Sequence, residues 1–342
     1  LHYPLRRQRQ MCIRDSLKIV VLLMLAVLTL TACGGGGEDA AETEVFRVAV
    51  VMPSAINDLA FSQSMYDALT AIQAERGADN FEFVYSENMF VVDDAAAAIR
   101  DYATQGFNLV IAHGSQYGSS LQEIAPDFPD TSFAWGTTVD TFGLDNVFAY
   151  EARSEEGGYV LGVMGAMLSE SGVIGVVGPI ETGDAKLYVD GFTAGAQTVA
   201  DDTQVNANWI GSFSDVALAS EAAQTHVGAG ADVLTGTAQM VVGAIGVAEE
   251  NGALWFGTQS SQTSLAPSIV VANQVYHWEV VLNQMLDLIE SGTLGGSSFL
   301  ITLENGGLVI DYNPAFSLPA EVTTAAGAAI DGIIDGTINI TP

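Results

Sequence analysis

The sequence predicts an α/β protein with two similar lobes, each built around a parallel sheet. Short apolar runs alternate with helical patterns along residues 46–135, and the same alternation starts again after residue 150. Such alternation indicates parallel sheets that helices cover on both faces. Two sets of similar length indicate two lobes, and 342 residues, 49% of them hydrophobic, are enough for two cores.

The first set of elements begins with a strand at residues 46–52. Four apolar residues follow one another from Val48 to Val51, as in strands that are buried on both faces. Pro53 ends this strand, and a polar turn leads into the next element. The expected elements after it are helices at 58–76, 93–105 and near 119–124, and strands at 81–85, 108–112 and 132–135.

The second set repeats this pattern. Its expected helices are 155–168, 185–200, 216–227 and 241–250, and its expected strands are 173–177, 205–210, 232–234 and 254–257. The elements that follow are too few for a third domain: strands at 269–271, 299–303 and 307–310, and helices at 275–290 and near 321–334. We expect these elements to cross back and complete both lobes through a three-strand hinge. The predicted lobes are 45–150 plus 273–302, and 151–272 plus 303–342.

Residues 1–32 are expected to be a signal peptide. The apolar run at 19–30 follows Lys18 and is too short for a comfortable membrane span. The sequence Leu-Thr-Ala-Cys that ends at Cys33 resembles a bacterial lipobox, which predicts cleavage before Cys33 and a lipid on its sulfur. A plain signal peptide with an incidental cysteine is the alternative.

The segments around this leader are also distinctive. Residues 33–44 are rich in glycine and then in acids, which predicts a flexible tether. Residues 10–16 resemble a translated sequencing-library adapter, so residues 1–16 are expected to be an artefact in front of a truncated leader. With these residues set aside, Cys33 is the one cysteine left, so neither a disulfide nor a thiolate metal site is expected.

The charge balance narrows the range of partners. From residue 33 onward the chain has 40 acidic residues and 5 basic ones. A basic patch for nucleic acid or for an anionic lipid surface is therefore not expected. Phosphate and carboxylate ligands normally need Arg or Lys in the pocket, and of the five only Lys186 comes near a loop assigned to the cleft. We therefore expect a small neutral ligand.

Polar and aromatic residues follow several predicted strands, and ligands of open parallel sheets bind outside the carboxyl ends of the strands. Asp58 could either contact the ligand or cap its helix, and Trp278 could be core or a stacking platform. The candidate ligand-binding residues are Asn57, Asp58, Phe61, Ser62, Gln63, Ser115, Gln116, Tyr117, Gln239, Met240, Gln259, Gln262 and Trp278.

Several motifs in order resemble the basic-membrane-protein family of bacterial lipoproteins. The family typically reads Asp-Asp-Lys-Ser-Phe-Asn-Gln where this chain has Asn57-Asp58 and Phe61-Ser62-Gln63. Asp130 to Ala134 is similar to its Pro-Asp-x-x-Phe-Ala strand, and Glu155 to Gly162 to its Glu-Gly-Ser-Tyr-Leu-Ala-Gly helix start. Further matches lie at 173–178, 191–196 and 211–215, so the resemblance covers about residues 46–312.

The resemblance implies the type I periplasmic-binding-protein fold, with two Rossmann-like lobes. Family members with an assigned ligand deliver purine nucleosides to a membrane transporter, and the ring of Phe61 is expected to stack on the ligand. This chain departs from the family pattern on the ligand side. Gln259 replaces an acid, Thr137 stands at the position of another acid, and a family lysine falls near Tyr276.

The sequence thus predicts a substrate-binding protein of an ABC importer, and not an enzyme. It contains neither a phosphate-binding Gly-x-x-x-x-Gly-Lys loop nor a Gly-x-Ser-x-Gly elbow, and we expect no cofactor or metal. A purine nucleoside is the expected ligand, an ABC permease the expected partner, and a monomer on the outer face of the cytoplasmic membrane or in the periplasm the expected form. The alternatives are another ringed or sugar ligand, or a sensory receptor subunit for a membrane kinase.

Overall fold

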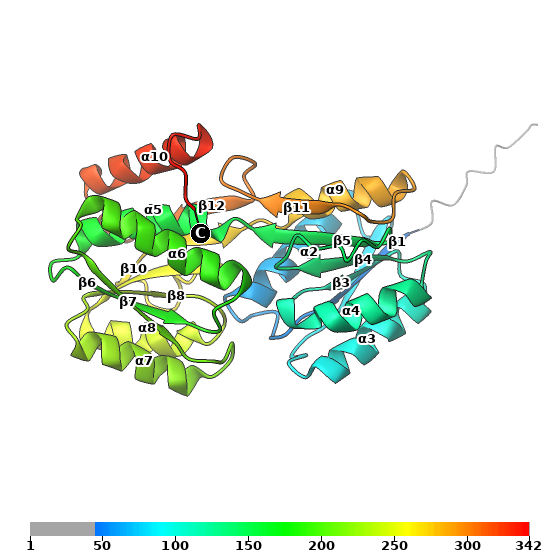
Figure 1. Ribbon diagram of the computed structural model, residues 1–342, viewed down its shortest axis with the longest axis horizontal. Helices are drawn as coiled ribbons and strands as arrows, with labels where there is room; N and C mark the ends of the chain where they lie inside the picture. Colours follow the sequence, from blue (N-terminus) through cyan, green and yellow to red (C-terminus); the bar gives the residue numbers. More distant parts are fainter. Residues whose placement is uncertain (1–44, 342) are drawn as a thin grey trace, which may run out of the picture. The chain divides into compact units, whose positions relative to one another are not determined.

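Two six-stranded sheets organise residues 45–341, the part of the chain that this computed structural model describes (Figure 1). All neighbouring strands of the first sheet pair in parallel. Its strand order is β11 (Ser298–Ile301), β5 (Val147–Ala152), β4 (Ser132–Gly136), β3 (Leu109–Ala112), β1 (Phe46–Val51) and β2 (Phe81–Ser86).

The second sheet has the same arrangement except at one edge. Its order is β12 (Leu308–Tyr312), β10 (Val270–Tyr276), β9 (Leu254–Gln259), β8 (Val233–Gly236), β6 (Val173–Gly178) and β7 (Gln204–Trp209). Strand β12 is antiparallel to β10, and the other neighbours are parallel. The predicted fold class, with two α/β lobes and parallel sheets, is confirmed.

Helices cover both faces of the first sheet, which explains why β1 is apolar without alternation. Val48 and Val50 belong to a core on one face, and Ala49 and Val51 belong to a core on the other. The first core is covered by α2 (Phe61–Arg76) and α9 (Glu279–Glu290), and the second by α3 (Val92–Thr104), α4 (Gly118–Ile124) and the 3-10 turns η1 (Ser115–Tyr117) and η2 (Ala125–Asp127).

The second sheet is sandwiched in the same way. Figure 1 shows α5, α6 and α10 on one side of it and α7 and α8 on the other. Each side has its own apolar core. The bounds of these helices are α5 (Ser154–Leu168), α6 (Gly183–Val199), α7 (Val216–Gly228), α8 (Val241–Asn251) and α10 (Ala320–Ile334).

The chain passes from one sheet to the other three times. It leaves the first sheet after β5, returns after β10 to form α9 and β11, and leaves again to form β12. These passages are the predicted three-strand hinge. The predicted boundary at residue 273 falls inside β10, whose ladder with the second sheet continues to Tyr276.

Two elements differ from the expected secondary structure. Residues 147–152, for which we expected no strand, form β5 between β4 and β11, and Val147, Phe148, Ala149 and Tyr150 are buried there. Strand β10 runs to Tyr276 although we expected a helix from residue 275. Hydrogen-bonded neighbours on both sides, β9 and β12, hold this segment extended, and such tertiary pairing overrides local propensity.

Helices α5 and α6 approach each other backbone against backbone. A Cβ added at Gly162 of α5 would collide with the carbonyl oxygen of Phe192, and one added at Gly195 of α6 would collide with that of Tyr159. Only glycine permits so close an approach. This contact sets the position of α6, whose first turn faces the site described below.

The substitution Gly162→Ala is expected to lower the free energy of unfolding by about 1 to 3 kcal/mol, because the two helices must separate. Denaturant unfolding followed by circular dichroism would measure this change. Gly246→Ala in α8 is the matched control, because nothing lies within 4 Å of the added methyl group. It is expected to be neutral or to stabilise by up to about 1 kcal/mol. Equal unfolding midpoints for both variants would contradict the close contact.

Candidate functional site

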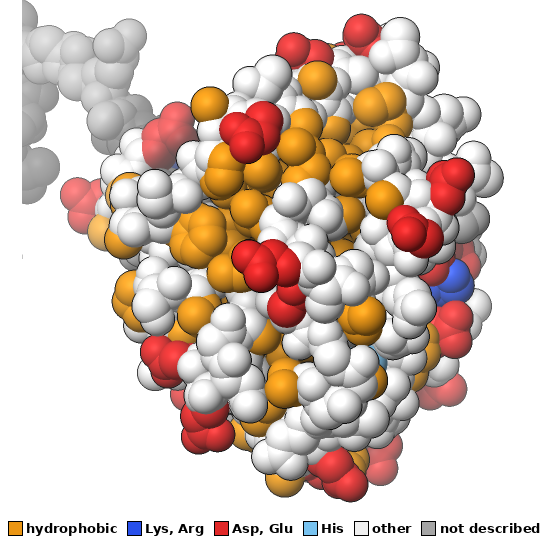
Figure 2. All heavy atoms as spheres, turned by 90° about the vertical axis from the view of Figure 1, so that its left-hand side faces the viewer, with side chains coloured by type: hydrophobic (Ala, Val, Ile, Leu, Met, Phe, Trp, Pro, Cys, Tyr) orange, Lys and Arg blue, Asp and Glu red, His pale blue; other side chains and the backbone are white. Residues whose placement is uncertain are grey.

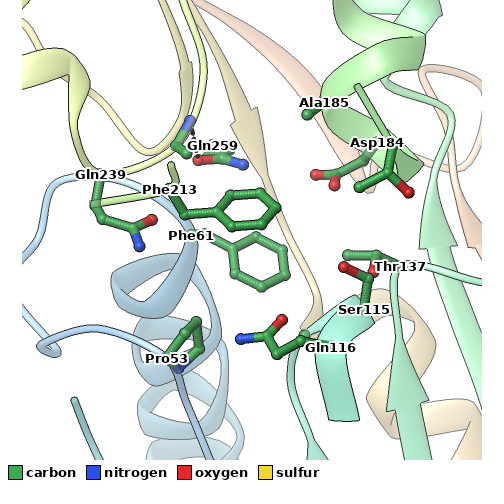
Figure 3. A pocket seen from close by; sticks show the side chains of 13 residues that line it. Pro53, Phe61, Ser115, Gln116, Thr137, Asp184, Ala185, Phe213, Gln239 and Gln259 are labelled. Atoms are coloured by element: carbon green, nitrogen blue, oxygen red, sulfur yellow. Dashed lines mark hydrogen bonds between the residues drawn. The ribbon is translucent and has the colours of Figure 1, made fainter. Parts of the chain in front are cut away.

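A cavity that opens to solvent lies between the carboxyl ends of the two sheets, with about 430 Å³ of unfilled space when that open solvent is included (Figure 3). The first lobe contributes the lining residues Pro53, Phe61, Gly114, Ser115, Gln116 and Thr137. The second lobe contributes Thr182, Asp184, Ala185, Phe213, Ala238, Gln239 and Gln259.

Phe61 is held rigidly at the wall of the first lobe. Its ring stacks on the imidazole of His113, with the ring centroids 3.8 Å apart and the planes 6° from parallel. His113 Nδ1 is 2.8 Å from the Tyr150 hydroxyl, and Nε2 is 3.1 Å from the Phe61 carbonyl oxygen. Burial lowers the pKa of His113 to about 3, so this histidine is neutral. It therefore serves as a flat apolar support for Phe61.

Trp278 lies behind this stack and does not line the cavity. Its indole is fully buried, meets the ring of Phe61 edge-on with centroids 6.4 Å apart, and donates from Nε1 to Ser64 Oγ at 2.9 Å. Of the two possible roles for Trp278, the structure places it in the core. It supports the wall formed by Phe61 and His113 from beneath.

Asp58 organises the turn between β1 and α2. Its carboxylate accepts hydrogen bonds from the backbone N–H groups of Ala60 at 2.8 Å, Gln63 at 3.1 Å and Ser62 at 3.2 Å. These bonds satisfy donors at the start of α2, so the helix begins at Phe61 and not at Asp58. Burial raises the pKa of Asp58, although these bonds and one from Ser54 oppose the rise.

The other predicted residues of this turn lie outside the cavity lining. Asn57 is exposed. Ser62 is buried, with its hydroxyl bonded to Ser54, and Gln63 Oε1 accepts from the backbone N–H of Leu59 at 3.0 Å. The turn therefore shapes the start of α2, and Phe61 is its member that faces the cavity.

Three loops after strands of the first lobe were predicted to face the ligand, and each of them contributes residues to the lining. Ser115 and Gln116, directly after β3, line the cavity. Tyr117 is buried beneath them and donates from its hydroxyl to the Met89 carbonyl oxygen at 2.8 Å. Thr137, after β4, also lines the cavity, and its buried hydroxyl has no hydrogen-bond partner among the described residues.

The second lobe presents two amides to the cavity. Gln239 lines it with a buried Nε2 that has no partner among residues 45–341. Gln259 Oε1 accepts from the backbone N–H of Ala238 at 3.2 Å. Met240 points away into the core of α7 and α8, so the predicted contribution of this loop comes from its glutamine.

Gln262 connects the two lobes and does not line the cavity. Its Oε1 accepts from Trp255 Nε1 at 2.8 Å, and its Nε2 donates to the carbonyl oxygen of Leu59 in the first lobe at 3.3 Å. Ser260 makes a second such bond, from Oγ to the Ala60 carbonyl oxygen at 3.0 Å. These contacts hold the end of β9 against the start of α2.

Asp184 is the ionisable group of the cavity lining. It lies in the first turn of α6 and is only 7% exposed. Burial raises its pKa from 3.8 to about 6, although hydrogen bonds from Gln259 and Tyr276 oppose the rise. The Tyr276 hydroxyl donates to Oδ2 at 3.3 Å. At neutral pH the cavity therefore carries one carboxylate, which is held only by uncharged groups.

Neither Lys nor Arg lines the cavity. Lys186, the basic residue nearest to a predicted cleft loop, pairs with Asp190 along α6. The outer surface is acidic as well, and on the face shown in Figure 2 red acidic side chains far outnumber blue ones. The site is therefore unsuited to a phosphate or a carboxylate, which would meet Asp184 without a compensating cation.

The fold agrees with comparisons against known proteins. Residues 45–327 match the Bmp family, described as ABC transporter substrate-binding protein PnrA-like. The chain belongs to this family. The predicted resemblance is thereby confirmed, and the Bmp-family chain is a binding protein for a small ligand and a partner of an ABC permease, not an enzyme.

Individual relatives are similar at low identity. A purine-binding protein of Brucella abortus is 28% identical over 261 residues, which cover 76% of this chain and 73% of that protein. The ABC transporter nucleoside-binding protein BmpA of Lactococcus lactis is 24% identical, with 94% and 97% covered. A solved ABC transporter solute-binding protein from Conexibacter woesei superimposes with a TM-score of 0.71 at 21% identity, and 87% and 99% of the two chains are covered.

The predicted leader and the lipidation site Cys33 lie outside the described residues. Within residues 45–341, every helix is too short or too polar to cross a membrane.

Sequence reasoning missed most of the cavity lining in the second lobe, where it found only Gln239 and Gln259. Asp184, Thr182 and Ala185 follow β6 after an intervening loop, and we read residues 185–200 only as a helix. Phe213 lies in a stretch that matches the family pattern, and that match was the available signal for it. Pro53, Gly114 and Ala238 line the cavity mainly through their position at strand ends.

Asp184→Asn is expected to stabilise the ligand-free protein at pH 8 by on the order of 1 to 3 kcal/mol. The folded-state pKa of Asp184 lies above its ordinary value, so ionisation opposes folding. This penalty is absent below about pH 4, grows as the pH rises through 6, and is constant above that.

Urea unfolding at pH 4, 6 and 8 would measure this difference, with Asp201→Asn as the control in an exposed turn. If the advantage of Asp184→Asn were the same at pH 4 and pH 8, the buried carboxylate would not be its cause.

Proposed function

We propose that this Bmp-family protein captures a purine nucleoside in the cavity and delivers it to the permease of an ABC importer. The observation that carries the proposal is the pair of aromatic rings on the cavity, Phe61 from the first lobe and Phe213 from the second. Figure 3 shows both rings in the middle of the lining. Flat heteroaromatic rings bind well between such side chains, because stacking adds to the burial of apolar area.

The two rings belong to different lobes, so a ligand between them would couple the lobes. Domain closure about a hinge is a common response to such ligands. The hydrogen bonds from Ser260 and Gln262 to the start of α2 would add to the closed arrangement. A closed form that depends on the ligand is what a permease needs in order to recognise a loaded binding protein.

The polar lining supports a neutral ligand with donors and acceptors on its edges. Figure 3 shows Gln239 on one side of the rings and Asp184, Thr137 and Ser115 on the other. Unpartnered buried amides and hydroxyls favour a ligand that satisfies them and disfavour analogues that do not. The relatives named for purine and nucleoside binding support the same ligand class.

A lipid on Cys33 would hold the protein at the outer face of the membrane, within reach of the permease. In a bacterial host, Cys33→Ser is expected to move the protein from the membrane fraction to the soluble fraction. If the variant stayed with the membrane, this anchor would be ruled out.

Isothermal titration of ligand-free protein with guanosine, inosine, adenosine and uridine is expected to show binding, with a preference for the purine nucleosides. Phe213→Ala should weaken it about 10-fold or more, because one stacking surface and its buried area are lost. Phe90→Ala is the control, since Phe90 is exposed and away from the cavity lining.

Two results would contradict parts of the proposal. Binding of a free sugar such as glucose without binding of any nucleoside would replace the ligand class and leave the transport role standing. Nucleoside binding with equal affinity in Phe213→Ala would place the ligand outside the aromatic pair.

A further inference from the structure

Asp184 is the strongest unexplained feature of the cavity. It is a buried carboxylate on a lining that includes neither Lys nor Arg. Its described partners are the hydroxyl of Tyr276, the side chain of Gln259 and the backbone N–H groups of the first turn of α6, and all of them are uncharged. A buried charge costs free energy unless it is paired or well hydrogen-bonded. A group in this position therefore suits a ligand that brings further hydrogen-bond donors.

Thr137 meets the same end of the cavity from the opposite lobe. Gly183 comes directly before Asp184. A Cβ atom added to Gly183 would lie 3.5 Å from Thr137 Cβ and 3.7 Å from Thr137 Oγ1, so the two segments are in close contact. Thr137 is only 8% exposed, and its hydroxyl has no partner among residues 45–341. Its backbone φ of +65° is unusual for a β-branched residue. Strained backbone conformations of this kind persist only where the surrounding structure holds them, and they cluster at functional sites.

We propose that Asp184 and Thr137 form a diol subsite, in which Asp184 accepts hydrogen bonds from the vicinal hydroxyl groups of a ribose and Thr137 bonds the same sugar edge. This inference rests on the proposed nucleoside function and makes Asp184 the residue that separates ribonucleosides from deoxyribonucleosides. Each of the two carboxylate oxygens can accept a hydrogen bond from one of the two neighbouring sugar hydroxyl groups. The threonine hydroxyl can both donate and accept. A ligand that offered only an ammonium group could donate to the Thr137 hydroxyl but could not accept from it. The hydroxyl proton of Thr137 would then stay unpaired.

The subsite also links recognition to closure. Asp184 belongs to the second lobe and Thr137 to the first, so a sugar bonded to both would hold the lobes together at this end. The aromatic pair would do the same for the base. A free base would engage only the rings, and a free sugar only the subsite.

Binding to this subsite is expected to depend on pH, because a protonated Asp184 loses acceptor capacity. The groups around Asp184 are Tyr276 on β10, Glu151 on β5 and, beyond Glu151, the pair of Arg153 and Glu155. Burial, followed by repulsion from Asp184 and Glu155, raises the pKa of Glu151 to about 7. Glu151 is not on the cavity lining, so it needs its own control.

The test compares affinities for guanosine, 2′-deoxyguanosine, 3′-deoxyguanosine and guanine by isothermal titration at pH 7.5. The wild-type protein should bind guanosine about 10-fold to 100-fold more tightly than either deoxynucleoside, since each lost bond to a buried charge is costly. Asp184→Asn should reduce this ratio to about 3-fold or less and should weaken guanosine binding more than guanine binding. Asp190→Asn, at a half-buried position of the same helix outside the cavity lining, should keep the wild-type ratio.

A measurement on unsubstituted protein guards against misfolding of the variant. The wild-type ratio should fall as the pH is lowered from 7.5 to 5, because Asp184 takes up a proton in this range. Glu151→Gln should retain that fall.

The outcomes separate the two proposals. A wild-type protein that binds no nucleoside overturns the proposed function and this inference with it. Nucleoside binding without a ribose preference, or with a preference that Asp184→Asn retains, overturns only the diol subsite. Loss of guanine binding in Asp184→Asn would also overturn it, because the residue would then contact the base or support the fold.

Discussion

Parallel pairing is the constraint on which the whole site depends. Within each lobe it gathers the loops that follow β1, β3 and β4, or β6, β7, β8 and β9, at one edge of the sheet. Three passages of the chain between the sheets hold these two edges opposite each other. The result is a cavity that is lined by short polar loops and two aromatic rings. The helices that cover the sheets mainly hold these loops in place.

Each wall of the cavity is fixed by contacts that lie behind it. In the first lobe, neutral His113 and buried Trp278 fix the ring of Phe61. In the second lobe, glycine contacts between α5 and α6 fix the first turn of α6 and with it Asp184. The burial of this carboxylate opposes folding at neutral pH, and a bound ligand that donates to it would offset the cost. Stability in the empty protein is thus lowered at the group that is best placed for recognition.

The sequence predicted the architecture well because it depends on the alternation of strands and helices. It also predicted the cavity residues that follow strands directly, such as Ser115, Gln116 and Gln239. Asp58 is different, since an acid at a helix start can satisfy backbone donors as readily as a ligand, and in the structure it does the former. Asp184 could not be predicted, because its burial depends on packing between α6 and the opposite lobe.

In the proposed complex a ringed ligand lies between Phe61 and Phe213, with its polar edge toward Asp184. A crystal structure of the protein grown with guanosine tests this most directly. We expect density for the base between the two phenyl rings and density for the ribose beside Asp184 and Thr137. Guanosine bound elsewhere on the protein, with Phe61 and Phe213 in contact with each other, would contradict it.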